Sequence, residues 1–440
     1  MTMGVQNPLS GQPLLLRQVR VFDGHSLASA LMDVRVEAGV ISAMASDLRL
    51  PQNLVDRGAE TIEGKGLILA PGFVDLRAAA REPGDEHEED LCSLSDAAIA
   101  GGFTAVVVSP DTTPGNDDHA VTELILRRAR EYGRCDVLPQ GALSHRLKGE
   151  TLAPMGEMSE AGAVCFGDGD RPMTSARLLR RALEYARGFD RPIFVHSIDA
   201  DLAGSGAVHE GPWSTRLGLR GVPAAAEHVA VARDIAVAQL ANSRLHFARV
   251  TTAKSVALIR AAKAEGIQVT ASVTPWHLTH TDADTATYDV NLKLVAPLRP
   301  EIDRQALLEG LRDGTIDAIC SDHMPVNIAQ KALEFDYAAP GAIAVQTVLA
   351  QVLSRVQAGE LSLEVALRAL TTGPRRVLAM DTQPLGVGSQ ADFTLIDPQA
   401  TWQLDATTNR SKSRNTVLWQ KPLQGRAMLT IFRGQIVWRA

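Results

Sequence analysis

The chain is poor in cysteine, in aromatic side chains and in long apolar runs. Its 440 residues include four cysteines, and aromatic residues make up 4% of the chain. The cysteines are scattered without a C-x-x-C pair, which excludes the dense disulfide framework of small secreted domains. No stretch approaches the roughly 18 apolar residues of a membrane-spanning helix. Because Met1 to Gln12 also lacks the basic flank and apolar centre of a signal peptide, we expect a soluble cytoplasmic protein.

Positive charge is also not in excess. Lys and Arg number 44 against 51 Asp and Glu, which gives a formal net charge of −7. A surface of this sign does not attract nucleic acid or an anionic membrane, so we expect neither as a partner. Hydrophobic residues at 45% and charged residues at 22% are ordinary for a folded globular chain.

Short β-like segments occupy the two ends of the chain. In residues 14–63, apolar and polar residues alternate with a period of two, interrupted by Gly and Asp turns. The same pattern occurs in ADFTLID, which ends at Asp397, and in AMLTIFRGQIVW, which ends at Trp438. We interpret residues 1–66 and 385–440 as one composite β-sandwich domain.

The middle of the chain alternates short apolar runs with helical patterns, which is typical of β/α units. Between the sixth and seventh runs, Val256, Ile259 and Ala262 repeat at helical spacing and Gly266 follows as a C-cap. Eight candidate strands predict an α/β fold with a TIM-like (β/α)8 barrel over residues 67–384. These strands are Leu67–Phe73, Thr104–Val108, Val137–Leu143, Ala163–Phe166, Ile193–His196, Leu245–Val250, Ile267–Val273 and Asp317–Ser321.

Polar side chains gather where these strands end. In a β/α barrel the active site lies at the carboxyl ends of the strands, so these positions are the first candidates for function. They are Asp75, Arg77, Arg81, Asp111, His145, Asp168, Asp170, His196, Arg249, Thr274, His277, Asp322 and His323.

Several of these positions lie in segments that resemble a known family. PGFVDLRAAAREPGDEHEEDL, FGDGD, IFVHSIDADL, LHFARVTT, SDHMP and SKSRNT together resemble a dihydroorotase of the amidohydrolase superfamily, over nearly the whole chain. The resemblance implies a β/α barrel of the amidohydrolase type that carries a small β-sandwich built from both termini.

The family binds zinc through residues that this chain has partly replaced. Family members continue the first strand as Asp-x-His-x-His, whereas Asp75 is followed here by Arg77 and Ala79. The ligand histidine of the sixth strand is Arg249. The matching positions that remain are His196, Asp168 and Asp322. We therefore expect no bound metal, no other cofactor and no catalytic residue.

Positions that contact substrate in the family have changed as well. Arg81 matches the arginine that pairs with the substrate carboxylate, but Asp111, Val295 and Val326 replace an Asn, an Asn and a His. A carboxylate at position 111 would repel an anionic substrate.

The loss of metal would leave buried carboxylates without a counter-charge. Because an unpaired buried carboxylate is costly, we expect Arg77 and Arg249 to neutralise Asp168 and Asp322 as buried ion pairs. The acidic run from Asp85 to Asp90 is interpreted as a solvated loop.

Three functions are compatible with these residues. The chain resembles the pseudo-dihydroorotases encoded beside aspartate carbamoyltransferase, which implies an inactive, self-associating subunit whose partner is the catalytic chain of that transferase in pyrimidine biosynthesis. The alternative is a divergent dihydroorotase or cyclic amidohydrolase with a mononuclear or absent metal site, because His196, Asp168 and Asp322 are the three ligands that a catalytic zinc needs at minimum. A weaker alternative is a sensor of pyrimidine intermediates in which Arg81 holds a carboxylate.

Overall fold

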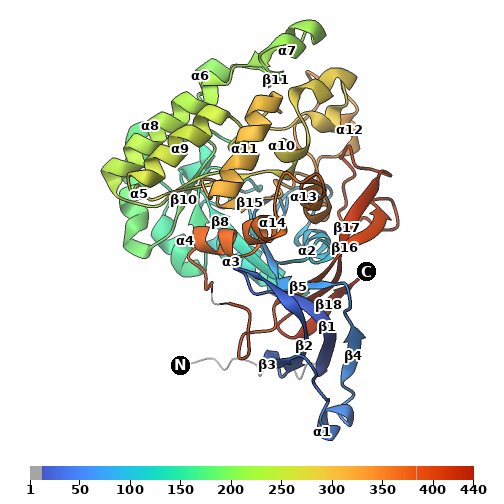
Figure 1. The fold of residues 1–440 in the computed structure, drawn as a ribbon. Coiled ribbons are helices and arrows are strands. Elements are labelled where there is room, and N and C mark those ends of the chain that lie inside the picture. The colour runs from blue at the N-terminus through green and yellow to red at the C-terminus, as the bar shows by residue number, and fades with distance from the viewer. Residues whose placement is uncertain (1–11, 383) are drawn as a thin grey trace.

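The computed structural model describes residues 12–382 and 384–440 (Figure 1). Residues 1–11 of the segment Met1 to Gln12, for which no signal peptide is expected, lie outside the described residues. Within the described ranges, no helix has both the length and the apolar character needed to cross a membrane.

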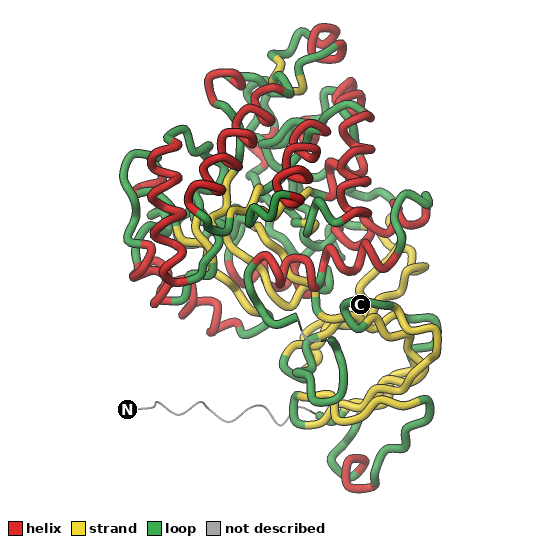
Figure 2. The backbone as a smooth tube through the Cα atoms, turned by 60° about the vertical axis from the view of Figure 1, so that its left-hand side comes forward, coloured by secondary structure: helices red, strands yellow, loops and turns green. Residues whose placement is uncertain are grey.

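The two ends of the chain form one curled sheet beside the barrel (Figure 2). Its strands run in the order β18-β17-β16-β5-β1-β2-β3, and β4 pairs with β1. Apolar side chains from both ends, among them Leu16, Val34, Phe393 and Ile431, share one buried core. The elements are β1 (Leu14–Phe22), β2 (Leu27–Glu37), β3 (Val40–Ala45), α1 (Gln52–Val55), β4 (Glu60–Glu63), β5 (Ile68–Pro71), β16 (Phe393–Gln403), β17 (Pro422–Phe432) and β18 (Gln435–Arg439).

Eight parallel strands form the barrel, in the order β15-β14-β13-β10-β9-β8-β7-β6. A parallel bridge between Ala78 and His323 joins the two ends of this order, and the Ala79 amide donates to the His323 carbonyl at 2.8 Å. The expected fold class is confirmed. The strands are β6 (Phe73–Ala78), β7 (Phe103–Val108), β8 (Asp136–Gly141), β9 (Cys165–Phe166), β10 (Ile193–Val195), β13 (Leu245–Phe247), β14 (Val269–Val273) and β15 (Ala318–Ile319).

The expected first barrel strand, Leu67–Phe73, is shared between the two sheets. Its first part, β5, pairs with β1 and β16 of the terminal sheet. The hydrogen-bond partner changes within one step, because the Gly72 amide donates to Asp392 and the Phe73 amide donates to Gly102. A Cβ at Gly72 would lie 2.2 Å from the side chain of Thr104, so only glycine fits at this crossing. The first barrel strand is therefore β6.

Helices cover the outside of the barrel (Figure 1). The predicted helix between the sixth and seventh strands is confirmed as α9, which buries Val256, Ile259 and Ala262 and begins after the N-cap Thr252. The main helices are α2 (Leu91–Ala100), α3 (His119–Tyr132), α4 (Met155–Ala161), α5 (Ala176–Ala186), α8 (Ala225–Ala241), α9 (Ala253–Ala264), α11 (Glu301–Asp313), α13 (Val348–Gln357), α14 (Leu363–Leu370) and α15 (Thr372–Val377).

Shorter elements lie in the loops that follow the strands. The segment that follows β10 and contains α6 and α7 lies at the top of Figure 1. Arg299 holds this segment against the barrel by donating to the Val222 carbonyl at 2.8 Å and to His209 Nδ1 at 2.9 Å. The short elements are η1 (His145–Leu147), η2 (Arg187–Phe189), α6 (Ala200–Ala203), β11 (Val208–His209), α7 (Pro212–Leu217), β12 (Gly221–Val222), α10 (Pro275–Thr279), η3 (Asp282–Thr287), η4 (Val290–Leu292) and α12 (Ile328–Lys331).

One histidine lies in the middle of a barrel strand. His246 of β13 is fully buried, and its Nδ1 and Nε2 lie 2.9 and 3.0 Å from the hydroxyls of Thr270 and Ser272. Burial lowers the pKa of His246 to about 3. The folded state therefore holds a neutral imidazole that the unfolded chain would protonate below its ordinary pKa of about 6.5.

We predict that this difference makes stability depend on pH. Because the pKa is lower in the folded state, its contribution is fully present above pH 6.5 and is lost as the pH falls toward 3. His246→Gln should remove roughly 2 kcal/mol of the decline in unfolding free energy between pH 7 and pH 5, measured by urea denaturation. The exposed His25, replaced by Gln, is the control and should leave the decline unchanged. Equal declines in wild type and His246→Gln would contradict the prediction.

Candidate active site

Two arginines and two aspartates meet at the carboxyl ends of the barrel strands. Arg77 of β6 donates from Nε to Asp322 Oδ1 at 2.8 Å and from Nη2 to Asp170 Oδ1 at 2.7 Å. Arg249, two residues after β13, donates from Nη1 to Asp322 Oδ1 at 3.0 Å and also to Asp170 Oδ1. We call these four residues the central ion cluster. It links the ends of β6, β13 and β15 to the loop after β9.

Burial makes the charges of this cluster interdependent. The side chains of Arg249, Arg77 and Asp322 are 0, 6 and 7% exposed, whereas Asp170 is 24% exposed. Burial opposes the charge of Arg77, but Asp170, Asp111 and Asp322 outweigh it and raise the pKa of Arg77. Burial likewise opposes the charge of Asp170, but Arg77 and Arg249 outweigh it and lower the pKa of Asp170. Arg77 and Asp170 therefore each stay charged because oppositely charged side chains lie beside them.

The cluster contains strained backbone and buried donors without hydrogen bonds, features that are often found at functional sites. Arg249 and Asp322 have φ values of +58° and +48°, a left-handed backbone that residues other than glycine rarely adopt. Within the described chain, Arg249 Nε and Nη2 form no hydrogen bond, although both atoms are buried. Strained residues and unpaired buried donors persist where the surrounding structure holds them in place.

The expected ion pair to Asp168 is replaced by one to Asp170. Asp168 accepts hydrogen bonds from the amides of Leu143 and Ser144, both at 2.9 Å, and from the Ser144 hydroxyl. Burial raises the pKa of Asp168 despite these bonds. Because Asp168 is satisfied by the loop after β8, Arg77 and Arg249 bind the next acid of the FGDGD segment.

His196 follows β10 and is buried beside the cluster. Burial, followed by the charge of Arg249, lowers the pKa of His196 to about 3, so the imidazole is neutral near pH 7. A neutral imidazole can donate one hydrogen bond from one ring nitrogen and accept one at the other, but it adds no charge to the cluster.

A second group of charges surrounds Arg81, whose backbone φ is +59°. Arg81 Nε lies 3.3 Å from Glu88 Oε2, and Nη1 lies 4.0 Å from Asp111 Oδ2. Nη2 also donates to the Pro325 carbonyl at 3.1 Å. We call Arg81, Glu88 and Asp111 the Arg81 group. It brings together two of the sequence-predicted substrate positions, Arg81 and Asp111, and one acid that the sequence did not indicate, Glu88.

The interpretation of Asp85 to Asp90 as a solvated loop is wrong for two of its residues. Glu88 pairs with Arg81, and Glu89 is fully buried with Oε2 3.2 Å from His323 Nε2. His323 Nδ1 in turn accepts the Ala344 amide at 3.1 Å. The acidic run alone does not predict these contacts, because the partners Arg81 and His323 lie outside it.

The other replaced positions contribute no polar group to the centre. Ala79 is buried, and its backbone amide donates to the His323 carbonyl where the barrel closes. Val326 is buried as well, and Val295 is half-buried. Asp75 accepts the Ser321 amide at 2.7 Å and the Ser321 hydroxyl, and burial raises the pKa of Asp75 to about 6. Asp75 thus holds the end of β15 next to β6.

Zinc is the metal that the family resemblance implies. Across residues 12–382 and 384–440, no group of three or more His, Cys, Asp or Glu side chains is placed to hold a metal ion. At an effective dielectric of about 20, a guanidinium about 4 Å from a divalent ion costs roughly 8 kcal/mol. With Arg77 and Arg249 on Asp322, the residues in this arrangement do not fit a zinc ion.

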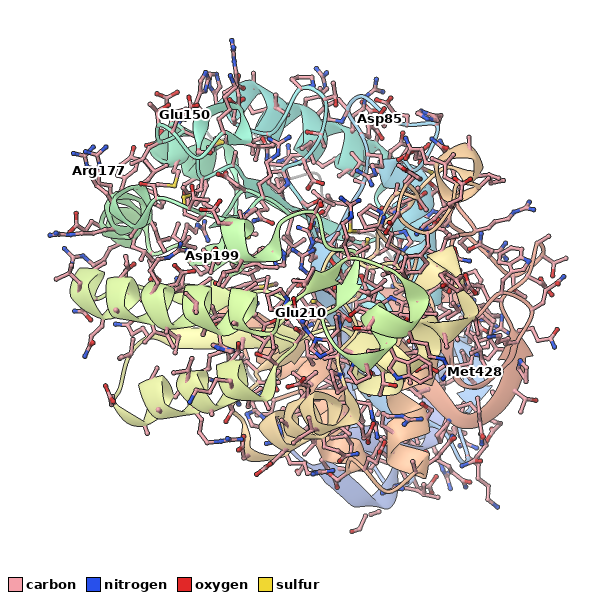
Figure 3. The ribbon with its side chains drawn as sticks, turned by 90° about the horizontal axis from the view of Figure 1, so that it is seen from above. Asp85, Glu150, Arg177, Asp199, Glu210 and Met428 are labelled. Atoms are coloured by element: carbon pink, nitrogen blue, oxygen red, sulfur yellow. The ribbon has the colours of Figure 1, made fainter. Side chains whose placement is uncertain are left out.

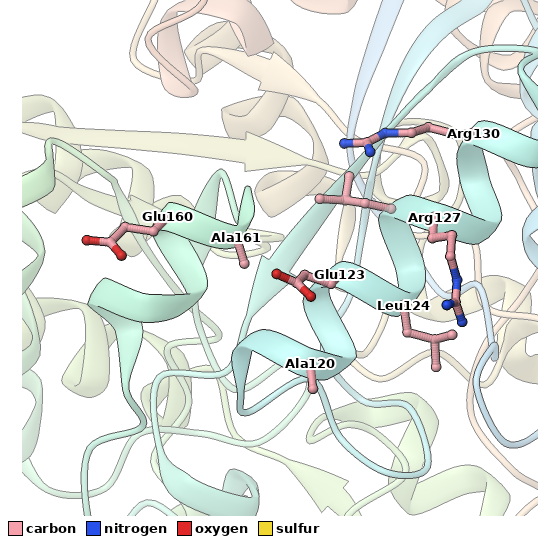
Figure 4. Close-up of a pocket in the computed structure, with 8 residues that line it drawn as sticks. Ala120, Glu123, Leu124, Arg127, Arg130, Glu160 and Ala161 are labelled. Atoms are coloured by element: carbon pink, nitrogen blue, oxygen red, sulfur yellow. The ribbon is translucent and has the colours of Figure 1, made fainter. Parts of the chain in front are cut away.

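Two further views show regions outside the central ion cluster. Figure 3, seen from above, shows Asp199 and Glu210 from segments after β10 toward the middle of the view, with Asp85 near the rim. A cavity of about 470 Å³ lies instead between α3 and α4, where Arg127, Arg130 and Glu160 contribute to its lining (Figure 4). None of the sequence-predicted site residues lines that cavity, so it is separate from the candidate active site.

Known proteins resemble the chain in both sequence and fold. A protein named Dihydroorotase from Syntrophobacter fumaroxidans is 42% identical over 422 residues, which cover 96% of each chain. A Dihydroorotase from Anaeromyxobacter dehalogenans is 43% identical over 426 residues, covering 96% of this chain and 97% of that one. Among solved structures, L-hydantoinase (dihydropyrimidinase) from Arthrobacter aurescens matches with a TM-score of 0.83 at 23% identity, covering 97% and 96% of the two chains. That structure supports the fold alone.

These relatives correct two expectations drawn from the sequence. The expectation of a pseudoenzyme is overturned, because relatives about 40% identical over nearly their full length are named Dihydroorotase. The expectation that no cofactor is used is overturned as well, because relatives named Dihydroorotase place the chain in the family for which the sequence resemblance implies zinc. The central ion cluster, in the arrangement described above, is not itself that zinc site. Both inferences were drawn from three replaced positions, Arg77, Ala79 and Arg249. The similarity to the relatives extends over nearly the whole chain and outweighs these three positions.

We predict that the central ion cluster is needed for stability. Arg249→Met should lower the unfolding free energy by roughly 3 kcal/mol, because it leaves the carboxylates of Asp170 and Asp322 without one of their two counter-charges. The matched control is Arg433→Met, whose ion pair with Asp136 is about half exposed and should contribute at most about 1 kcal/mol. Urea denaturation at pH 7 measures both. A loss at position 249 no larger than that of the control would refute the prediction.

The sequence matches extend to a family model as well. A model described as Dihydro-orotase-like matches residues 66–255, which run from just before β5 into α9. The curated relatives extend the similarity over 96% of the chain, at more than 40% identity. The chain belongs to the dihydroorotase-like family of the amidohydrolase superfamily.

Proposed function

We propose that the protein is a divergent cyclic amidohydrolase of the dihydroorotase type. The observation that carries this proposal is Asp322, which matches a site residue of the family and projects from the carboxyl end of β15 into the central ion cluster. The nearly full-length similarity to proteins named Dihydroorotase supports it. A cyclic amide is therefore the class of substrate to test first.

The chemistry of such a reaction suits the charges of the cluster. Hydrolysis breaks the bond between the carbonyl carbon and the ring nitrogen, while the hydroxyl of water joins the carbon and a proton joins the nitrogen. Asp322 is the candidate group to hold or move a proton. Although the charges of Arg77 and Arg249 are matched by the two carboxylates, Arg249 Nε and Nη2 donate no hydrogen bond within the described residues, and these N–H groups would favour negative charge developing on the carbonyl oxygen.

The test is turnover by the purified full-length chain. We expect saturable hydrolysis of at least one cyclic amide among dihydroorotate, 5,6-dihydrouracil and hydantoin, assayed both as purified and with added zinc. Asp322→Asn should reduce kcat by about 100-fold or more, because a group that transfers protons contributes that much. Asp56→Asn in the terminal sheet domain is the control, since Asp56 is exposed on α1's C-terminal side. Absence of turnover for all three compounds in both conditions would refute the proposal.

We also propose association with the catalytic chain of aspartate carbamoyltransferase, together with self-association. The support is the family resemblance and an exposed apolar surface beside α12. Ile328 and Tyr337 are each 75% exposed and Leu333 is 47% exposed, within ten residues of one another. Apolar side chains that cluster on a surface mark interaction sites more often than single ones do.

The expected outcome is a complex of fixed stoichiometry when the two chains of the same organism are produced together. Ile328→Ser with Tyr337→Ser should weaken it at least tenfold, measured by analytical ultracentrifugation. The control is Val55→Ser, at an exposed apolar residue of the terminal sheet domain. Independent sedimentation of the wild-type chains would contradict the association.

A further inference from the structure

The Arg81 group has a charge balance that bears on the choice of substrate. Arg81 already faces two carboxylates, with Glu88 at 3.3 Å and Asp111 at 4.0 Å, and it also donates to the Pro325 carbonyl. A guanidinium that is free to bind a substrate carboxylate would have its donors unused. Here one positive charge is opposed by two negative ones.

Asp111 is held in place by the backbone next to it. Gly169 has a φ of +64°, and a Cβ there would lie 2.9 Å from Asp111 Oδ1, so the carboxylate packs directly against this glycine. Oδ1 is buried, and no donor in the described part of the chain bonds to it. Oδ2 faces Arg81. Tight packing on one side therefore keeps the negative charge beside Arg81.

The neighbouring cluster does not restore a positive field. Arg77 and Arg249 are matched there by Asp170 and Asp322. Over the two groups together, four carboxylates outnumber three guanidinium groups. Arg81 and Asp111 keep 17 and 20% of their side-chain surface exposed, so this side of the site is in contact with solvent.

We infer that the site selects an uncharged cyclic amide over a ring that carries a carboxylate, and that Asp111 is the specificity-determining residue. This inference rests on the proposed function and names its substrate class. At an effective dielectric of about 20, a second carboxylate about 5 Å from Asp111 meets repulsion worth more than a tenfold change in affinity. A neutral ring amide is not repelled by Asp111, and its N–H groups can donate hydrogen bonds to the carboxylate.

Two matched compounds test the inference. Dihydroorotate and 5,6-dihydrouracil share one ring and differ by the carboxylate. Their dissociation constants for the full-length protein are measured by calorimetry, and their kcat/KM values are measured in parallel. We expect wild type to prefer 5,6-dihydrouracil by at least tenfold. Asp111→Asn, which keeps the shape and removes the charge, should shift this ratio toward dihydroorotate by at least tenfold.

Asp56→Asn makes the same change of net charge far from the barrel and should leave the ratio within twofold of wild type. A wild-type preference for dihydroorotate, a ratio unchanged by Asp111→Asn, or binding of neither compound would overturn the inference. The expected binding preference without turnover would support it while refuting the proposed hydrolysis. Turnover with a preference for dihydroorotate would support the proposed hydrolysis and refute the inferred selection of an uncharged ring. Circular dichroism of each variant verifies that it is folded.

Discussion

The structure at the carboxyl ends of the barrel strands depends on the pairing of two guanidinium groups with two carboxylates. Arg77 and Arg249 both reach Asp322 and Asp170, and through them the ends of three barrel strands and one loop are joined. Because burial penalises each charge alone, the cluster is stable only as a set. The same pairing holds charged groups at positions that match site residues of the family in the sequence resemblance, so the proposed function would use residues that also stabilise the fold.

Much of the fold could be predicted from the sequence, because it follows from local periodicity. Eight apolar runs between helical patterns indicated the barrel, and α9 buries the residues whose spacing predicted a helix. The exception is Leu67–Phe73, where one apolar run serves two sheets. Hydrophobic pattern shows that such a run is buried, but the change of partner at Gly72 depends on contacts with Asp392 and Gly102, which no local pattern contains. The boundaries at residues 66 and 385 stay a prediction.

The candidate site was less predictable, because it is assembled from long-range contacts. The sequence indicated that Arg77 and Arg249 would pair with acids, and Asp322 is one of them. It did not indicate Asp170 in place of Asp168, since this choice depends on Ser144 and Leu143 satisfying the first acid. Single replaced ligands also led to the wrong conclusion that the chain is inactive, which the full-length similarity overturned.

A double-mutant cycle between Arg77 and Asp322 tests the account most directly. The two side chains are joined at 2.8 Å and are both buried, so their contributions to stability should depend strongly on each other. The unfolding free energies of wild type, Arg77→Met, Asp322→Asn and the double variant give the coupling between them. The account predicts a coupling of about 2 kcal/mol or more. A coupling below about 0.5 kcal/mol would show that the two residues contribute independently, and would contradict an ion cluster at the centre of the site.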